Sequence, residues 1–173
     1  MNISKKLWII GWFLGPAFTC EQLHASGAAL CTSQEKVIFT CGFKNNKMVS
    51  LCGSADDAQS YIEYRFGSKS AVEFTFKASK STADRVFHRA EVVYARNAED
   101  TIWFKNGQYT YSIFLPARGA PGLEVSRDGE IAAHLECQGG WGGVKGNPKL
   151  ESRLIRDHGS SNPSGLEQFG LDG

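Results

Sequence analysis

The chain has 173 residues, with 19 basic and 18 acidic side chains and a formal net charge of +1. This balance argues against nucleic acid as a partner, because nucleic-acid-binding proteins carry a clustered excess of Lys and Arg. It argues equally against simple electrostatic attachment to anionic lipid. The length is that of about one domain.

The first residues have the layout of a secretory signal peptide. Lys5 and Lys6 precede the apolar run 7–14, which is shorter than the roughly 20 apolar residues of a transmembrane helix. Small residues and a cleavage box at 23–25 follow. We therefore expect cleavage after Ala25, export to the periplasm or the medium, and no transmembrane segment in the mature chain. An uncleaved anchor or a buried helix is the alternative.

Five cysteines are present, and Cys20 lies within the predicted signal peptide. Acylation of Cys20, as in a lipoprotein, is a second alternative, but the bulky Phe18 stands where a lipobox carries a small residue. The other cysteines form an even set, which in an oxidising compartment predicts disulfides: Cys31, Cys41, Cys52 and Cys137. Their spacing contains no C-x-x-C, which argues against zinc. All three connectivities remain open, although internal pairing of all four requires one bridge to Cys137.

Strand patterns dominate the first half of the mature chain. Residues 36–43 and 48–52 predict a hairpin in which a three-residue loop pairs Phe43 with Val49 and Cys41 with Leu51. Two further runs alternate with period two and place these side chains on the core face: Ile62, Tyr64, Phe66, Val72, Phe74 and Phe76. A strand through 92–94 follows.

Asn106-Gly107 predicts a tight hairpin between 102–105 and 108–115. A two-residue turn pairs Phe104 with Tyr109 and makes their face the buried one. Trp103 then lies on the opposite, exposed face, and we expect a binding surface there made of Trp103, Lys105, Gln108 and Thr110. The alternatives are a three-residue loop at 105–107, which makes Trp103 part of the core, and a second sheet that covers Trp103.

A second hairpin centres on Asp128-Gly129. A three-residue loop at 127–129 pairs Val125 with Ile131 and gathers the apolar side chains on one face, so we favour it over a two-residue loop. After Cys137 the chain becomes rich in Gly, Ser and Asn.

These elements predict an all-β protein in which antiparallel hairpins form a small disulfide-tied sandwich or barrel. The predicted boundaries are a signal peptide at 1–25, a β domain at 26–141 and a flexible tail at 142–173. Residues 149–157 of the tail have the composition of a short helix.

Catalytic and metal-binding patterns are missing. None of His88, His134 and His158 has a second ligand at i+2 or i+4, so we expect no metal and no cofactor. The motifs G-x-S-x-G, S-x-x-K and H-E-x-x-H do not occur. Glu63 and Glu73 are carboxylates that could face one another across neighbouring strands, as a glycosidase requires, but we prefer to interpret them as exposed alternating charge on a sheet.

The run from Cys31 to Cys52, the segment 61–67 and the later hairpins resemble small uncharacterised secreted or periplasmic proteins of Gram-negative bacteria. A looser resemblance is to the periplasmic lysozyme inhibitors, although their inhibitory loop motif is not found here. We expect an exported, non-enzymatic binding module, an inhibitor or immunity-like protein against an envelope-targeting enzyme, with a protein or glycan of the cell envelope as its partner. An envelope hydrolase and a structural accessory subunit are the alternatives.

Overall fold

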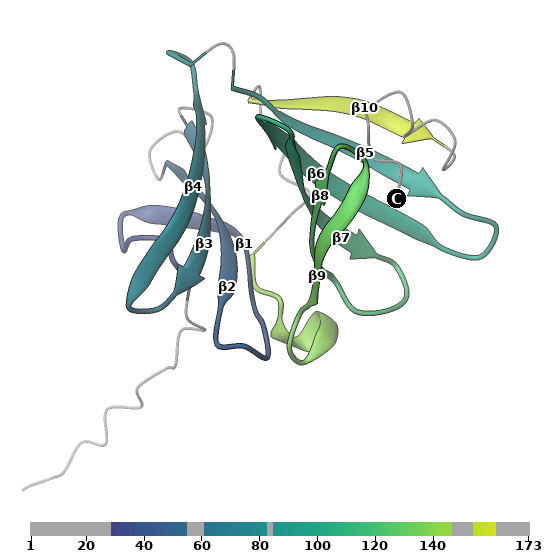
Figure 1. The fold of residues 1–173 in the computed structure, drawn as a ribbon, viewed down its shortest axis with the longest axis horizontal. Coiled ribbons are helices and arrows are strands. Elements are labelled where there is room, and N and C mark those ends of the chain that lie inside the picture. The colour runs from purple at the N-terminus through teal and green to yellow at the C-terminus, as the bar shows by residue number, and fades with distance from the viewer. Residues whose placement is uncertain (1–28, 55–60, 83–84, 147–153, 162–173) are drawn as a thin grey trace, which may run out of the picture.

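The computed structural model describes residues 29–54, 61–82, 85–146 and 154–161, and the predicted signal peptide lies outside them. Two sheets pack face to face (Figure 1). The first has the order β1-β2-β3-β4, made of β1 (Glu35–Gly42), β2 (Met48–Ser54), β3 (Tyr61–Ser68) and β4 (Ala71–Ser79). The expected all-β, sandwich-like fold is therefore confirmed.

The second sheet has six strands in the order β10-β5-β6-β7-β8-β9. Its strands are β5 (Phe87–Val93), β6 (Ala98–Asn106), β7 (Tyr109–Pro116), β8 (Gly122–Arg127), β9 (Glu130–Glu136) and β10 (Ile155–Ser161). A short 3₁₀ helix, η1 (Gly140–Gly143), follows β9. Among the described residues no helix is long and apolar enough to cross a membrane.

Aromatic side chains from both sheets form the centre of the core. The ring of Phe104 on β6 lies 4.0 Å from that of Phe76, 5.0 Å from those of Tyr64 and Tyr111, and 5.3 Å from that of Phe87, measured between centroids. Such offset and edge contacts add to the stabilisation that burial of the rings supplies. The period-two alternation of β3 and β4 thus identifies their core face correctly up to the turn between them.

Val72 is the exception, because its side chain is 47% exposed. A β-bulge interrupts the β3–β4 ladder, which pairs Phe66 with Phe74 but Gly67 with Val72. One extra residue reverses the faces of the strand beyond it, so Val72 turns outward. Glu63 and Glu73 also do not face each other, since Glu63 pairs with Lys77.

In the β1–β2 and β6–β7 hairpins the side chains lie on their predicted faces, but the strands pair in a shifted register. Cys41 pairs with Val49 rather than Leu51, and Phe104 pairs with Tyr111 rather than Tyr109. Each shift is two residues, which leaves every side chain on its predicted face because the strand period is two. The β6–β7 turn is Gly107-Gln108, with φ of 62° at the glycine alone, as in a type II′ turn.

The predicted β8–β9 hairpin is present, but its predicted three-residue loop is wrong. Asp128 and Gly129 form a two-residue turn with φ of 51° and 88°, the pattern of a type I′ turn. A bulge farther along pairs Val125 with Ala133, where the three-residue loop would have paired it with Ile131. Ile131 is consequently 53% exposed.

Part of the expected flexible tail is regular structure. Ile155–Ser161 forms β10, which pairs in parallel with β5, so the helix predicted for 149–157 is wrong at its described C-terminal end. Closer to β9, the Thr40 amide donates to the Lys145 carbonyl at 2.9 Å, and the Lys145 amide donates to the Thr40 carbonyl at 3.0 Å. The segment after β9 therefore covers the edge of β1.

Two disulfides tie these parts together. Cys31 bonds to Cys52 and Cys41 bonds to Cys137, with sequence separations of 21 and 96 residues. The expected bridge to Cys137 is present and joins the end of β9 to β1. The other bridge fastens the N-terminal residues to β2.

Candidate functional site

Trp103 is the predicted binding residue that the structure corrects most clearly. It lies on the face of β6 opposite Phe104, as expected, but only 1% of its surface is exposed. It forms a small separate cluster with Ala90 and Val92. The expectation of an exposed tryptophan is therefore wrong, because the outer face of this sheet is itself covered.

The other three predicted binding residues do not form a surface with Trp103. Thr110 is 7% exposed, whereas Lys105 and Gln108 are exposed near the hairpin end. With its amide oxygen turned toward Arg127, Gln108 accepts bonds from Nε and Nη2 at 3.2 and 3.0 Å. The four residues are thus divided between buried and exposed positions and do not form one exposed surface.

Two histidines lie against Trp103 instead. The imidazole centroids of His88 on β5 and His158 on β10 lie 5.3 and 5.4 Å from the indole, with interplanar angles of 18° and 23°. Nδ1 of His88 is 2.9 Å from Nε2 of His158. The sequence placed these two residues 70 positions apart and offered no sign that they meet.

The ring geometry identifies this contact as a hydrogen bond. The two imidazoles are inclined by only 15°, and their centroids lie 5.2 Å apart. That separation is close to the longest that a 2.9 Å contact between rim atoms allows, so the two nitrogens point at each other. Metal ligands would instead converge on a third point. No group of three or more potential metal ligands occurs in the described parts of the chain.

Both histidines have a lowered pKa. Burial lowers the pKa of His88 to about 4, and the charges of His158, Arg156 and Lys105 act in the same direction. Burial also lowers the pKa of His158, with Arg156 adding to the effect and Asp157 opposing it. At neutral pH both rings are therefore uncharged, and one donates its proton to the other.

A second polar group lies on the outer face of the same sheet. Burial and the charge of Glu124 raise the pKa of Glu99, although the hydroxyl of Thr101 donates a 3.2 Å bond to its carboxylate. Glu124 in turn lies 3.0 Å from Nδ1 of His134, whose ring stacks on Phe114 at 4.9 Å. These residues combine a carboxyl group of raised pKa with a second carboxylate, which acid–base chemistry needs.

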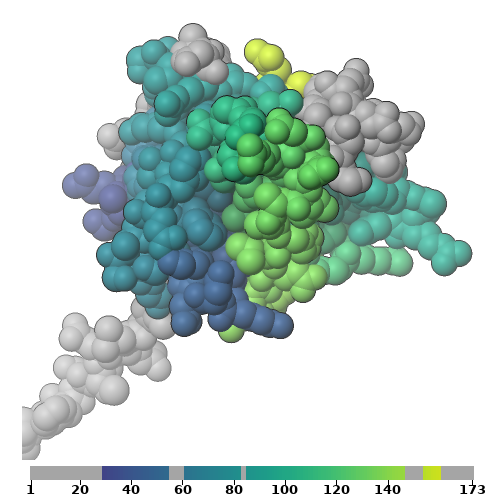
Figure 2. Space-filling view, in the orientation of Figure 1, coloured from purple at the N-terminus to yellow at the C-terminus, as the bar shows by residue number. Residues whose placement is uncertain are grey.

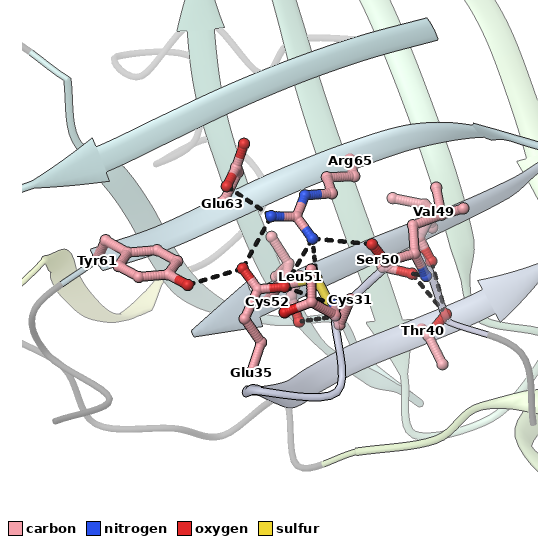
Figure 3. Close-up of a disulfide and its surroundings, with 12 residues drawn as sticks. Cys31, Glu35, Thr40, Val49, Ser50, Leu51, Cys52, Tyr61, Glu63 and Arg65 are labelled. Carbon is pink, nitrogen blue, oxygen red and sulfur yellow. Dashed lines mark hydrogen bonds and ion pairs between the residues drawn. A yellow bond between two sulfur atoms is a disulfide. The ribbon is translucent and has the colours of Figure 1, made fainter. Parts of the chain in front are cut away.

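The outer face of the four-stranded sheet holds an ion-pair network (Figure 3). Arg65 donates to both carboxylate oxygens of Glu35 at 2.7 and 2.8 Å, to Glu63 at 2.8 Å and to the carbonyl of Leu30 at 2.8 Å. Such bidentate bonds are the strongest that arginine makes. The network fastens the N-terminal residues beside the Cys31–Cys52 disulfide.

Glu35 carries the clearest electrostatic effect of this network. Burial by itself would raise its pKa, but bonds from Arg65, the Thr32 amide and the Tyr61 hydroxyl lower it to about 2. A carboxylate held so firmly in the charged form is a poor general acid or base. We therefore assign the network a structural role.

Among the described strands, β9 has the most exposed side chains. All of its side chains are exposed except that of Leu135, which is half-buried. It pairs only with β8 in the described chain, so its other edge presents backbone donors and acceptors. A cavity beside the turn is lined by Arg127, Asp128, Glu130, Ile131 and Ala132. In Figure 2 the green atoms of the β8–β9 region form part of the front surface.

No protein-family model, curated protein or solved structure matches this chain.

Proposed function

We propose that the protein is an exported, non-enzymatic binding module that holds an extended segment of a protein partner along the open edge of β9. The proposal rests on the observation that, among the described residues, β9 pairs on one side only, with β8, and that all its side chains except Leu135 are exposed. Addition of a strand to such an edge is a common mode of peptide recognition, in which main-chain bonds supply affinity. Neighbouring pockets supply specificity, and a cavity lined in part by Ile131 and Ala132 lies at the turn end of β9.

The chemistry of the edge agrees with this role. Many proteins protect a free edge with lysine or proline, which β9 lacks, although it carries a bulge and two glutamates. Its bulge leaves a regular ladder from Ala133 to Glu136, and small alanines at 132 and 133 leave room for a partner's side chains. The acidic ends, Glu130 and Glu136, favour a segment that carries basic residues.

Export is supported by the two cysteine pairs, since disulfides persist in oxidising compartments. In the sharpest form of the proposal, the partner is an enzyme that attacks the cell envelope and the protein is its inhibitor or immunity factor. Intact mass of protein recovered from the periplasm should then match a start near Ser26. A mass that retains residues 1–25, or that includes acyl chains, would contradict this part.

Site-directed photo-crosslinking in living cells tests the binding edge. A benzophenone amino acid at Ala132 should give a discrete protein adduct, which mass spectrometry identifies as an envelope protein. The same probe at Val72, which is also exposed and lies on the other sheet's edge strand β4, is the matched control and should give none. Absence of a protein adduct at position 132, or equal adducts at both positions, would refute the edge as the binding surface.

An envelope hydrolase acting on glycan or peptide is the second candidate, and the raised pKa of Glu99 beside Glu124 favours it. Purified protein would then release fragments from peptidoglycan, and Glu99→Gln would abolish the release. Inactivity of the wild-type protein on this substrate would leave the binding module as the preferred function.

A further inference from the structure

We propose that the His88–His158 pair is an acid-sensitive latch that holds β10 on the edge of the six-stranded sheet and opens when the pair is protonated. Opening would detach β10 from β5 and uncover the indole of Trp103. The inference is independent of the binding function, because β9 lies at the opposite edge of the sheet.

The histidine pair links two strands, because His88 lies on β5 and His158 on β10. β10 reaches β5 from a distant part of the sequence and pairs in parallel over Ile155–Asp157, after which the register shifts. At the shift, Gly159 has φ of 70° and its amide bonds to Oδ1 of Asp157 at 2.8 Å. This bend lies directly beside His158, whose ring meets His88 above Trp103.

The bond between the rings exists only while at least one nitrogen of the contact lacks a proton. Neutral imidazole has one donor and one acceptor nitrogen, whereas the protonated ring has two donors. Protonation of both rings therefore removes the acceptor and sets two positive charges against each other. The charged neighbours strengthen this effect, since Arg156 of β10 and Lys105 of β6 both act on His88.

Other contacts between β10 and its neighbours respond differently to acid. On β5, Arg89 lies 3.5 Å from Asp157 and 2.9 Å from Asp100, and Glu91 accepts a 2.6 Å bond from Ser160. Asp157 also favours the charged form of His158, which opposes the latch. Histidine is the one side-chain type whose ordinary pKa puts its change of charge between pH 5 and pH 8, so the two rings are the acid-sensitive part of this contact.

The expected size follows from linkage. A histidine that titrates near pH 4 when β10 is docked and near its ordinary 6.5 when β10 is released binds more protons in the open state. Stability of the docked strand is therefore complete above pH 6.5 and is lost as the pH falls toward 4. For His88 alone, the opening equilibrium rises about 30-fold between pH 7.5 and pH 5.

Hydrogen exchange of the full chain measures this opening. Peptides that span β10 should exchange about 30-fold faster at pH 5 than at pH 7.5, after correction for the intrinsic pH dependence of exchange. Peptides from β2 and β3 in the other sheet should show no such change. Equal protection of β10 at both pH values would overturn the proposal.

A double variant separates the latch from general acid sensitivity. His88→Phe with His158→Phe keeps aromatic rings over Trp103 but cannot titrate, so β10 should lose its pH dependence. His134→Phe, which replaces an exposed histidine on β9, is the matched control, and in this variant the exchange of β10 should keep its pH dependence. Retained pH dependence in the double variant would refute the proposal. If that variant does not fold, the ¹⁵N titration of wild-type His88 decides, because a pKa at or above its ordinary 6.5 would equally overturn it.

Discussion

Replacement of Trp103 by alanine tests whether the outer face of the six-stranded sheet is covered. The side chain is 1% exposed and lies among Ala90, Val92, His88 and His158. A large aromatic residue buries about 150–250 Å². At about 25 cal/mol per Å², its removal forfeits roughly 3–5 kcal/mol once the methyl group of alanine is allowed for, in the range measured for such truncations.

Urea unfolding followed by far-UV circular dichroism gives the change in the free energy of unfolding without relying on tryptophan fluorescence. Trp141→Ala is the matched control, since that residue is 44% exposed and makes one 3.0 Å bond, from its indole nitrogen to the carbonyl of Pro116. We expect about 1 kcal/mol or less for the control. A loss below about 1 kcal/mol for Trp103→Ala would refute the burial of this residue.

Three further outcomes follow from the disulfides, the ion-pair network and one turn. Cys137→Ser should lower the free energy of unfolding by about 4.7 kcal/mol and Cys31→Ser by about 3.3 kcal/mol, because the Cys41–Cys137 bridge closes the longer loop. Urea unfolding without reductant measures both losses, and the reverse order would contradict the pairing. Glu35 titrates near pH 2 in the folded state and near 4.5 when unfolded, so stability should fall as the pH drops from 4.5 toward 2. Glu35→Gln should flatten that dependence in an acid titration, and an unchanged curve would argue against the network. Gly129→Ala should cost about 1 kcal/mol in thermal unfolding because φ there is 88°, and Gly42→Ala, which meets no neighbour, is its control.

The sequence predicted the faces of the strands better than their partners. Cys41 and Phe104 keep their predicted faces although each pairs two residues away from the expected position. Alternation of apolar and polar residues predicts which face of a strand is buried, but it does not distinguish two pairing registers that differ by two residues. Val72 and Ile131 were misplaced because a bulge inserts one residue, and neither segment carries a local signal for it.

The candidate site was harder to predict than the fold. Trp103 was placed on the correct face, yet its exposure depended on what else covers that face. The edge of β9 followed from topology, since only the order of strands in the sheet shows which strand has a free side. Hairpin signals identify β8 and β9 as neighbours but do not say which of them lies outermost.

Composition, cysteine count and local alternation by themselves determined that this chain is an all-β protein with a bridge to Cys137. These properties depend on residue types and on neighbours within a few positions. The tertiary structure alone decided that β10 pairs with β5 and that His88 meets His158. Parallel pairing between strands far apart in the sequence depends on packing and backbone bonds that form only when those strands meet, so no local sequence pattern predicts it.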